Sequence, residues 1–355
     1  MGPASAGPSR MPASLAPSFR LRLAFLLLAV AIPAAQSAGP SPSATKELHA
    51  LFESEWERGL RENPVAASYQ GDSRYDDRWA DLSAGALARS HAADRAVLQA
   101  LERIPPGRLS EADRLNRDLF ARQYHGEIDA YEWGLRFLPI TQRRGVQTAH
   151  QLAEILPFKT VRDYENWIAR LGSLDTYVDQ TIELMREGMR RGLVQPRVIM
   201  ERVPAQIAKQ VVTDPAESPF YAPFRKMPDS IPAADQERLR AAARRSIEQD
   251  VLPAYARLQA FFNNQYLPAC RDTVGVWDTP GGADWYQERV RWFTTTELTA
   301  DEVHEIGLKE VARIRGEMQK VIERVGFKGS FAEFLHFLRT DPQFRYTDPD
   351  QLLQA

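Results

Sequence analysis

The chain has 355 residues, of which 44% are hydrophobic and 26% are charged, and its formal net charge is −2. This length is enough for one large core or for two domains. Acidic and basic residues are interspersed, and the sequence lacks the strongly basic footprint of a nucleic-acid-binding protein. We therefore expect a globular protein with no nucleic-acid partner.

The N-terminal segment, residues 1–37, has the pattern of a signal peptide. Arg20 and Arg22 precede an apolar run of ten residues, and small residues follow the run. This order predicts cleavage between Ser37 and Ala38. The apolar run is about half as long as a membrane-spanning helix, so an uncleaved anchor is the less favoured alternative. We expect an exported protein, periplasmic or secreted, with no stable membrane span after cleavage.

The predicted signal peptide has two possible starts and is followed by a predicted linker. Its start is Met1 or Met11, because the stretch before the positive charges is long. Residues 38–45 are rich in Pro, Ser and Gly and are predicted to link the leader to the fold. The helical part then extends over residues 46–355.

Cys270 is the only cysteine in the chain. One thiol cannot form an intramolecular disulfide, so the core alone must stabilise this exported protein. We interpret Cys270 as a small buried hydrophobic residue rather than as a nucleophile.

Apolar residues recur at helical spacing through most of the chain. The longest such pattern covers residues 233–266, and Pro253 within it predicts a kink. Alternating strand patterns are almost absent outside residues 285–298. We predict a mainly α fold, a multi-helix array with long kinked helices and at most a small β element near residues 285–298.

Three segments interrupt the helical patterns. Residues 70–82 are rich in aspartate but lack the spacing of a calcium-binding EF-hand loop, which favours a solvated or arginine-paired loop. Residues 135–157 are irregular and less polar than most loops, so they are predicted to pack on the core or to line a cleft. Residues 214–232 contain five prolines and are the candidate domain seam or surface excursion.

The stretch from residue 281 to residue 326 contains the best candidates for a functional site. Thr299 begins a helix with a capping box, and apolar residues then recur along one face of this helix. Gly307 lies in that face, so we expect another backbone to pack close to it. His304 and Glu310 lie at the two edges of the face, where a structural role is the alternative to contact with a substrate.

An aromatic segment that includes Trp285 and Tyr286 precedes this helix. The glycines at 281 and 282 would let another backbone approach closely. Two interpretations stay open for this segment: core packing, or one wall of a substrate cleft. The candidate cleft residues are thus Trp285, Tyr286, His304 and Glu310.

The histidines lack the spacing of a helical zinc site, which needs H-E-x-x-H. His304 and Glu305 begin this motif, but Leu308 stands where the second histidine belongs, and no two histidines are closer than 25 residues. The sequence also contains no G-x-S-x-G, no P-loop and no dinucleotide fingerprint. We therefore predict no catalytic residue, no metal ligand and no cofactor within this chain.

Several short motifs nevertheless resemble successive landmarks of one bacterial family. In chain order they are Arg61-Glu62-Asn63-Pro64, Leu138-Pro139-Ile140, Arg186-Glu187-Gly188, Ser218-Pro219-Phe220-Tyr221 and His304-x-x-Gly307-Leu308-x-Glu310-Val311. Over about residues 46–355 the chain resembles the exported bacterial family catalogued as domain of unknown function 885. It departs from that family at Trp285-Tyr286, where paired tyrosines are frequent, and at Trp292-Phe293, where a histidine is common.

The resemblance implies a mainly helical protein related to the zincin metallopeptidases. It implies zinc as the cofactor of the full-length protein, a peptide-like substrate, and an H-E-x-x-H motif in a C-terminal half that this sequence lacks. No catalytic residue can be carried over, because the matching positions are absent. A helix-start signature at Thr347 is followed by only a few residues, which also suggests the N-terminal portion of a longer protein.

Two functions stay open. The first is the N-terminal part of an exported zinc metallopeptidase-like hydrolase, inactive alone. The second is a non-catalytic helical binding or scaffold module of the periplasm. A reading frame that continues past Ala355 into H-E-x-x-H would favour the first, and a stop codon at that point would favour the second.

Overall fold

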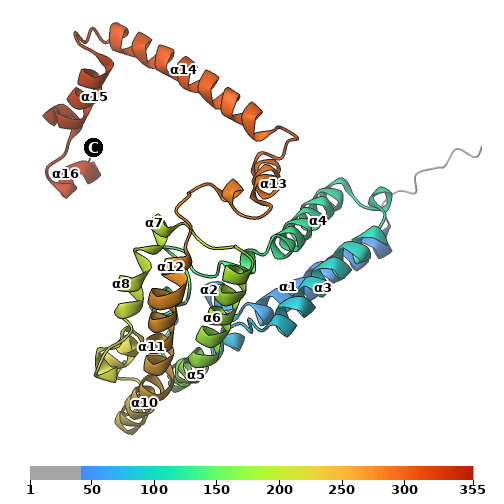
Figure 1. Ribbon diagram of the computed structural model, residues 1–355, viewed down its shortest axis with the longest axis vertical. Helices are drawn as coiled ribbons and strands as arrows, with labels where there is room; N and C mark the ends of the chain where they lie inside the picture. Colours follow the sequence, from blue (N-terminus) through green and yellow to red (C-terminus); the bar gives the residue numbers. More distant parts are fainter. Residues whose placement is uncertain (1–40, 355) are drawn as a thin grey trace, which may run out of the picture. The chain divides into compact units, whose positions relative to one another are not determined.

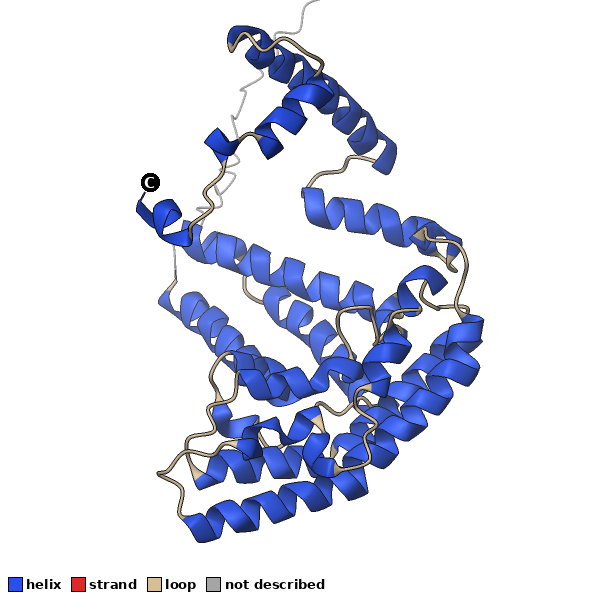
Figure 2. Ribbon diagram, turned by 90° about the vertical axis from the view of Figure 1, so that its left-hand side faces the viewer, coloured by secondary structure: helices blue, strands red, loops and turns tan. Residues whose placement is uncertain are grey.

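The computed structural model describes residues 41–354, and helices make up most of them (Figure 1). Figure 2 shows helices joined by loops in this part of the chain, where no β-sheet is present. The predicted mainly α, multi-helix array is confirmed. The helices are α1 Pro42–Glu62, α2 Pro64–Tyr69, α3 Ala84–Glu102, α4 Glu111–Glu132, α5 Val161–Gly172, α6 Leu174–Arg190, α7 Arg197–Met200, α8 Val203–Ala208, α9 Ala222–Arg225, α10 Ala233–Ser246, α11 Leu252–Phe261, α12 Leu267–Ala269, α13 Gly282–Thr294, α14 Ala300–Arg324, α15 Phe331–Thr340 and α16 Pro349–Gln354.

The predicted signal peptide and its cleavage between Ser37 and Ala38 lie outside the described residues. The sequence predicts a linker over residues 38–45. Helix α1 begins at Pro42, so residues 42–45 of that segment are helical. Among residues 41–354, no helix is both long enough and apolar enough to cross a bilayer.

A small core cluster joins α1, α3 and α4. Leu48, Leu101 and Tyr124 are buried in it. Helix α3 begins after Ser83 and α4 after Ser110, and each serine hydroxyl accepts a hydrogen bond from a backbone amide in the first turn. Such caps satisfy amides that have no partner inside the helix, so the sequence fixes where these two helices begin.

The larger core joins α5, α6, α10 and α11. Trp167 on α5 has no exposed surface, and its Nε1 donates a hydrogen bond to the carbonyl oxygen of Phe220 at 3.1 Å. Phe220 belongs to residues 214–232, the candidate seam, whose aromatic side chains are buried in this core. Cys270 is also buried there, as the sequence predicts, and burial raises the pKa of its thiol to about 11.

Two π turns interrupt the long helical pattern of residues 233–266. They cover Ile247–Val251 and Phe262–Tyr266, and a proline follows each turn two residues later, at Pro253 and Pro268. A proline ring in a regular helix clashes with the carbonyl group four residues earlier, and a wider turn relieves this clash. The structure thus has a π turn where the sequence predicts a kink.

The small β element that the sequence allowed at most near residues 285–298 is absent from the described residues, because most of this stretch belongs to α13. Aromatic residues favour strands only where the surroundings fit a sheet. Here Trp285 and Trp292 are seven residues apart, so they lie on one side of a helix. A Cβ atom on Gly126 of α4 would lie 2.5 Å from the Trp292 ring, which shows how closely α13 packs on α4.

Helix α14 begins with the predicted capping box at Thr299 and is followed by Gly326, whose φ of +68° is the left-handed conformation typical after a helix end. Only Ile322 is buried among its side chains. Open space surrounds the position of a Cβ on Gly307, so the expected close approach of another backbone is absent in the described residues. The exposed side chains that we call the α14 apolar face are Ile306, Val311, Ile314, Met318, Val321 and Val325.

Candidate functional site

Two of the four predicted cleft residues lie on α13 and make separate contacts. Trp285 is buried; its ring centre lies 5.9 Å from that of Trp133, and the Arg289 guanidinium lies 4.7 Å from its ring. Tyr286 is exposed and packs edge-on against Trp277 with ring centres 5.6 Å apart. Of the two interpretations that the sequence left open, the contacts of Trp285 favour packing.

The other two predicted residues, His304 and Glu310, lie exposed on α14. The Glu310 carboxylate accepts a hydrogen bond from Nε of Arg313 at 2.9 Å, an ordinary surface ion pair. Among residues 41–354, no hydrogen bond, ion pair or ring contact joins this pair to Trp285 or Tyr286. The described part of the chain therefore does not bring the four candidates into one cluster.

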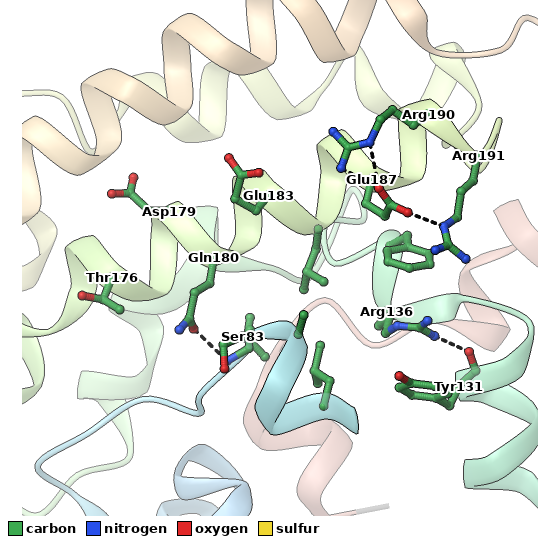
Figure 3. Close-up of a pocket in the computed structure, with 15 residues that line it drawn as sticks. Ser83, Tyr131, Arg136, Thr176, Asp179, Gln180, Glu183, Glu187, Arg190 and Arg191 are labelled. Atoms are coloured by element: carbon green, nitrogen blue, oxygen red, sulfur yellow. Dashed lines mark hydrogen bonds and ion pairs between the residues drawn. The ribbon is translucent and has the colours of Figure 1, made fainter. Parts of the chain in front are cut away.

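A cleft of about 730 Å³ lies elsewhere, between the start of α3, helix α6 and the segment that follows α4 (Figure 3). This volume lies within the usual range of sites for small organic molecules. Leu82, Leu87 and Leu184 contribute apolar surface to the cleft, and charged side chains lie at its two ends (Figure 3).

The segment after α4 supplies one wall of this cleft. The chain turns at Gly134, which has a φ of +75°, and a Cβ atom there would lie 2.9 Å from the Leu193 side chain. Glycine meets both requirements of this position. The turn places Arg136 in the cleft wall and buries Phe137 beside it. The prediction that residues 135–157 pack on the core or line a cleft is confirmed here.

The Arg136 guanidinium is held between two aromatic rings. Its central carbon lies 3.7 Å from the centre of the Tyr131 ring and 4.2 Å from that of Phe137. Its Nη1 donates a hydrogen bond to the carbonyl oxygen of Tyr131, in the last turn of α4. No carboxylate in residues 41–354 forms a hydrogen bond or ion pair with it. Burial lowers the pKa of Arg136, because removal from water disfavours the charged form.

Two further arginines, Arg190 and Arg191, lie at the same end of the cleft (Figure 3). Glu187 accepts hydrogen bonds from Nε of Arg191 at 2.6 Å and from Nε of Arg190 at 2.8 Å. These bonds, that of Arg191 first, lower the pKa of Glu187. With Arg136 the end holds three guanidinium groups and one carboxylate, so it carries excess positive charge.

The opposite end of the cleft is close to neutral. Asp179 forms two hydrogen bonds of 3.0 Å with Arg257, and Glu183 accepts one of 2.6 Å from Arg186. Neither arginine lines the cleft. Gln180 accepts a hydrogen bond of 2.7 Å from the backbone just before α3 and so joins α6 to the start of α3. Charge is therefore unevenly distributed along the cleft.

Comparison with known proteins identifies the family. The family described as "Bacterial protein of unknown function (DUF885)" matches residues 64–355. The chain belongs to the DUF885 family. A solved structure from Colwellia psychrerythraea, provisionally described as a lipoprotein, is similar to this chain, with a TM-score of 0.73 and 20% sequence identity. The match covers 88% of this chain and 57% of that one, and no curated protein matches the chain.

The TM-score of 0.73 shows that the DUF885 chain and the Colwellia protein share a fold, and with an identity of only 20% the comparison shows nothing beyond the fold. The chain matches little more than half the length of that solved structure. The TM-score describes the helical array as a whole, so the roles of individual side chains rest on the contacts within this chain.

The histidines of this DUF885 chain do not fit the zinc ion that the zincin resemblance implies for the full-length protein. Nε2 of His49 lies 2.9 Å from Oδ1 of Asp113, and His91 stacks on Tyr131 with ring centres 4.0 Å apart. Within residues 41–354, no three His, Cys, Asp or Glu side chains are grouped closely enough to hold a metal ion.

Sequence reasoning did not find Arg136 as a site residue of this DUF885 chain. One signal pointed to its surroundings: Glu187 and Gly188 belong to a motif by which the chain resembles the family. A Cβ atom on Gly188 would lie 2.8 Å from the carbonyl oxygen of Phe137, so this glycine lets the cleft wall pack against α6. The motif at Arg186-Glu187-Gly188, together with the irregular and less polar residues 135–157, was the signal in the sequence that could have indicated this cleft.

Proposed function

We propose that this chain is the helical N-terminal part of a larger exported hydrolase of the metallopeptidase type and is inactive by itself. The predicted leader supports export to the periplasm or beyond the cell, and the description of the Colwellia protein as a lipoprotein agrees with it. The longer chain of that protein supports a larger full-length DUF885 protein.

The observation that supports the larger-protein part of this proposal is the α14 apolar face, whereas the hydrolase part rests on the resemblance to the zincin metallopeptidases. Its exposed fractions include 65% for Val311, 46% for Ile314 and 39% for Met318. Single exposed apolar residues are normal on a protein surface, but a continuous stripe at helical spacing marks a surface that makes a contact. The open space at Gly307 would let an incoming helix approach the backbone of α14.

In this proposal the α14 apolar face packs against the part of the full-length protein that holds the zinc ligands and the general base. That part would supply a metal-activated water for attack on a peptide carbonyl group. Residues 41–354 would provide walls and substrate contacts. No residue among them is assigned a catalytic role.

The test compares the full-length gene product with the 355-residue chain. Both are purified, their zinc content is measured, and each is incubated with a mixed peptide library with and without a chelator. We expect one zinc ion per full-length chain and peptide hydrolysis that the chelator abolishes, with neither property in the 355-residue chain. Chelator-sensitive hydrolysis by the 355-residue chain would contradict the proposal, and a full-length product without zinc or hydrolysis would favour a non-catalytic module.

A further inference from the structure

We propose that the cleft between α3 and α6 binds an organic carboxylate that has an apolar body. Arg136 would hold the carboxylate, and the leucine side chains of the cleft would contact the body. This inference does not rest on the hydrolase proposal, because a ligand can bind here whether or not the full-length protein is an enzyme.

Arg136 is the group that selects an anion. It is the guanidinium in the cleft wall that no carboxylate of residues 41–354 neutralises, whereas Arg190 and Arg191 share Glu187. A planar guanidinium donates two parallel hydrogen bonds to a carboxylate, an arrangement stronger than neutral hydrogen bonds. The rings of Tyr131 and Phe137 fix its plane before a ligand arrives, so little conformational entropy is lost on binding.

A structural role alone does not use the whole donor capacity of Arg136. Its hydrogen bond to the Tyr131 carbonyl oxygen completes the last turn of α4 and occupies one N–H group. A guanidinium has five such groups. Arg136 lines a cleft large enough for a small organic molecule, and no carboxylate of residues 41–354 occupies its remaining donors.

The other residues that line the cleft indicate the polarity and charge of the rest of the ligand. Leu82, Leu87 and Leu184 offer apolar surface next to the positively charged end. Contact with apolar surface does not stabilise a strongly hydrated ion such as free phosphate. Transfer of an apolar body from water to such surface is favourable and would strengthen binding. The excess of positive charge at this end also matches a ligand with one or two negative charges better than a polyanion.

Two sources can supply this chemistry: the C-terminal carboxylate of a peptide and the carboxylate of a fatty acid. The probes are therefore N-acetyl-leucyl-leucine, the same peptide with a C-terminal amide, and decanoate. Binding of each to the full 355-residue chain is measured by isothermal titration calorimetry. We expect the free acid to bind at least about tenfold more tightly than the amide, the effect of one charge-assisted hydrogen bond. Tighter binding of decanoate would assign the carboxylate to a lipid source.

Substitutions separate a charge effect from a change in shape. Arg136→Gln should weaken binding of the acid at least about tenfold, and Arg244→Gln serves as the control, because Arg244 stacks on Tyr221 away from the cleft. Ala84 lines the cleft in the first turn of α3, where a carboxylate stabilises the helix. Ala84→Glu should therefore fold and repel the ligand, whereas Ala84→Gln, of the same size, should bind it.

If the Arg136→Gln variant does not fold, the comparison of acid binding by Ala84→Glu and Ala84→Gln tests the proposal by itself. The proposal is overturned if neither acid binds saturably below about 1 mM. It is equally overturned if the peptide acid binds saturably but no more tightly than its amide, or if Ala84→Glu and Ala84→Gln bind the tighter of the two acids equally well.

Discussion

The guanidinium of Arg170 lies 3.9 Å from the carboxylate of Asp76, and both side chains are buried. Arg170 also donates hydrogen bonds to the carbonyl oxygens of Tyr75 at 2.8 Å and Arg78 at 3.0 Å. These contacts hold the aspartate-rich residues 70–82 against α5. The sequence-based interpretation of an arginine-paired loop is confirmed for Asp72, Asp76 and Asp77, which pair with Arg74, Arg170 and Arg78. Asp81 instead accepts hydrogen bonds from the Ser83 backbone amide and from Gln180.

Arg170→Met is expected to destabilise the fold strongly. Burial lowers the pKa of Arg170 to about 10, so it is charged at neutral pH and compensates the buried Asp76 carboxylate. Removal of one partner from a buried pair typically costs roughly 3 kcal/mol or more. Urea denaturation measures the free energy of unfolding. Arg78→Met, which removes an exposed pair with Asp77, should cost less than about 1 kcal/mol, and equal losses in the two variants would contradict this account.

Asp113 is expected to make stability depend on acid pH. Its carboxylate lies 2.9 Å from Nε2 of His49 and accepts a hydrogen bond from Thr45 Oγ1 at 3.1 Å, and His49 is the first cause of its lowered pKa. Because the folded-state pKa lies below the unfolded value of about 3.9, this stabilisation is present above that value and is lost as the pH falls through the folded-state pKa.

The measurement for Asp113→Asn is thermal unfolding from pH 6 to pH 2. The difference in Tm between the natural chain and the variant should be largest near pH 6 and should shrink as the pH falls below about 4. Thr45→Val, which removes one hydrogen bond and keeps the ionisable carboxylate, should retain most of the pH dependence. A Tm difference for Asp113→Asn that stays constant over the whole range would refute this role of Asp113.

Gly126→Ala tests the close contact between α4 and α13. Alanine normally stabilises a helix relative to glycine by about 0.5–1 kcal/mol, but the new methyl group would overlap the Trp292 ring. Overpacking of this kind costs about 1–3 kcal/mol, so the net effect should be destabilising.

The matched control for this change is Gly59→Ala in α1, where nothing lies within 4 Å of the added atom. This substitution should stabilise the chain by about 0.5–1 kcal/mol. Denaturation curves of both variants give the comparison, and stabilisation of similar size in both would show that α13 does not pack on Gly126 as described.

Features determined by neighbouring residues were predictable from the sequence. The predicted capping box at Thr299 joins atoms three residues apart and is present in the structure, which has two more of the same kind at Thr160 and Ser330. The burial of Cys270 also follows from local chemistry, and the kink predicted at Pro253 is present as a π turn just before it.

Features that depend on distant residues were not predictable. The fit of Trp292 onto Gly126 joins positions 166 residues apart, and the aromatic composition of α13 locally suggested a strand. The cleft likewise combines the start of α3, one face of α6 and the turn at Gly134. No single segment shows in its sequence that Arg136 faces this cleft without a carboxylate partner.

The α14 apolar face gives the most direct test of the central claim that further protein covers it in the full-length molecule. Ile314→Glu is made in the 355-residue chain and in the full-length protein, with Lys309→Glu as a control outside the face, and the free energy of unfolding is measured for each. In the 355-residue chain Ile314 is exposed, so its loss should change stability by less than about 0.5 kcal/mol. In the full-length protein the same change should cost roughly 2–4 kcal/mol; an equally small effect in both proteins would contradict the account.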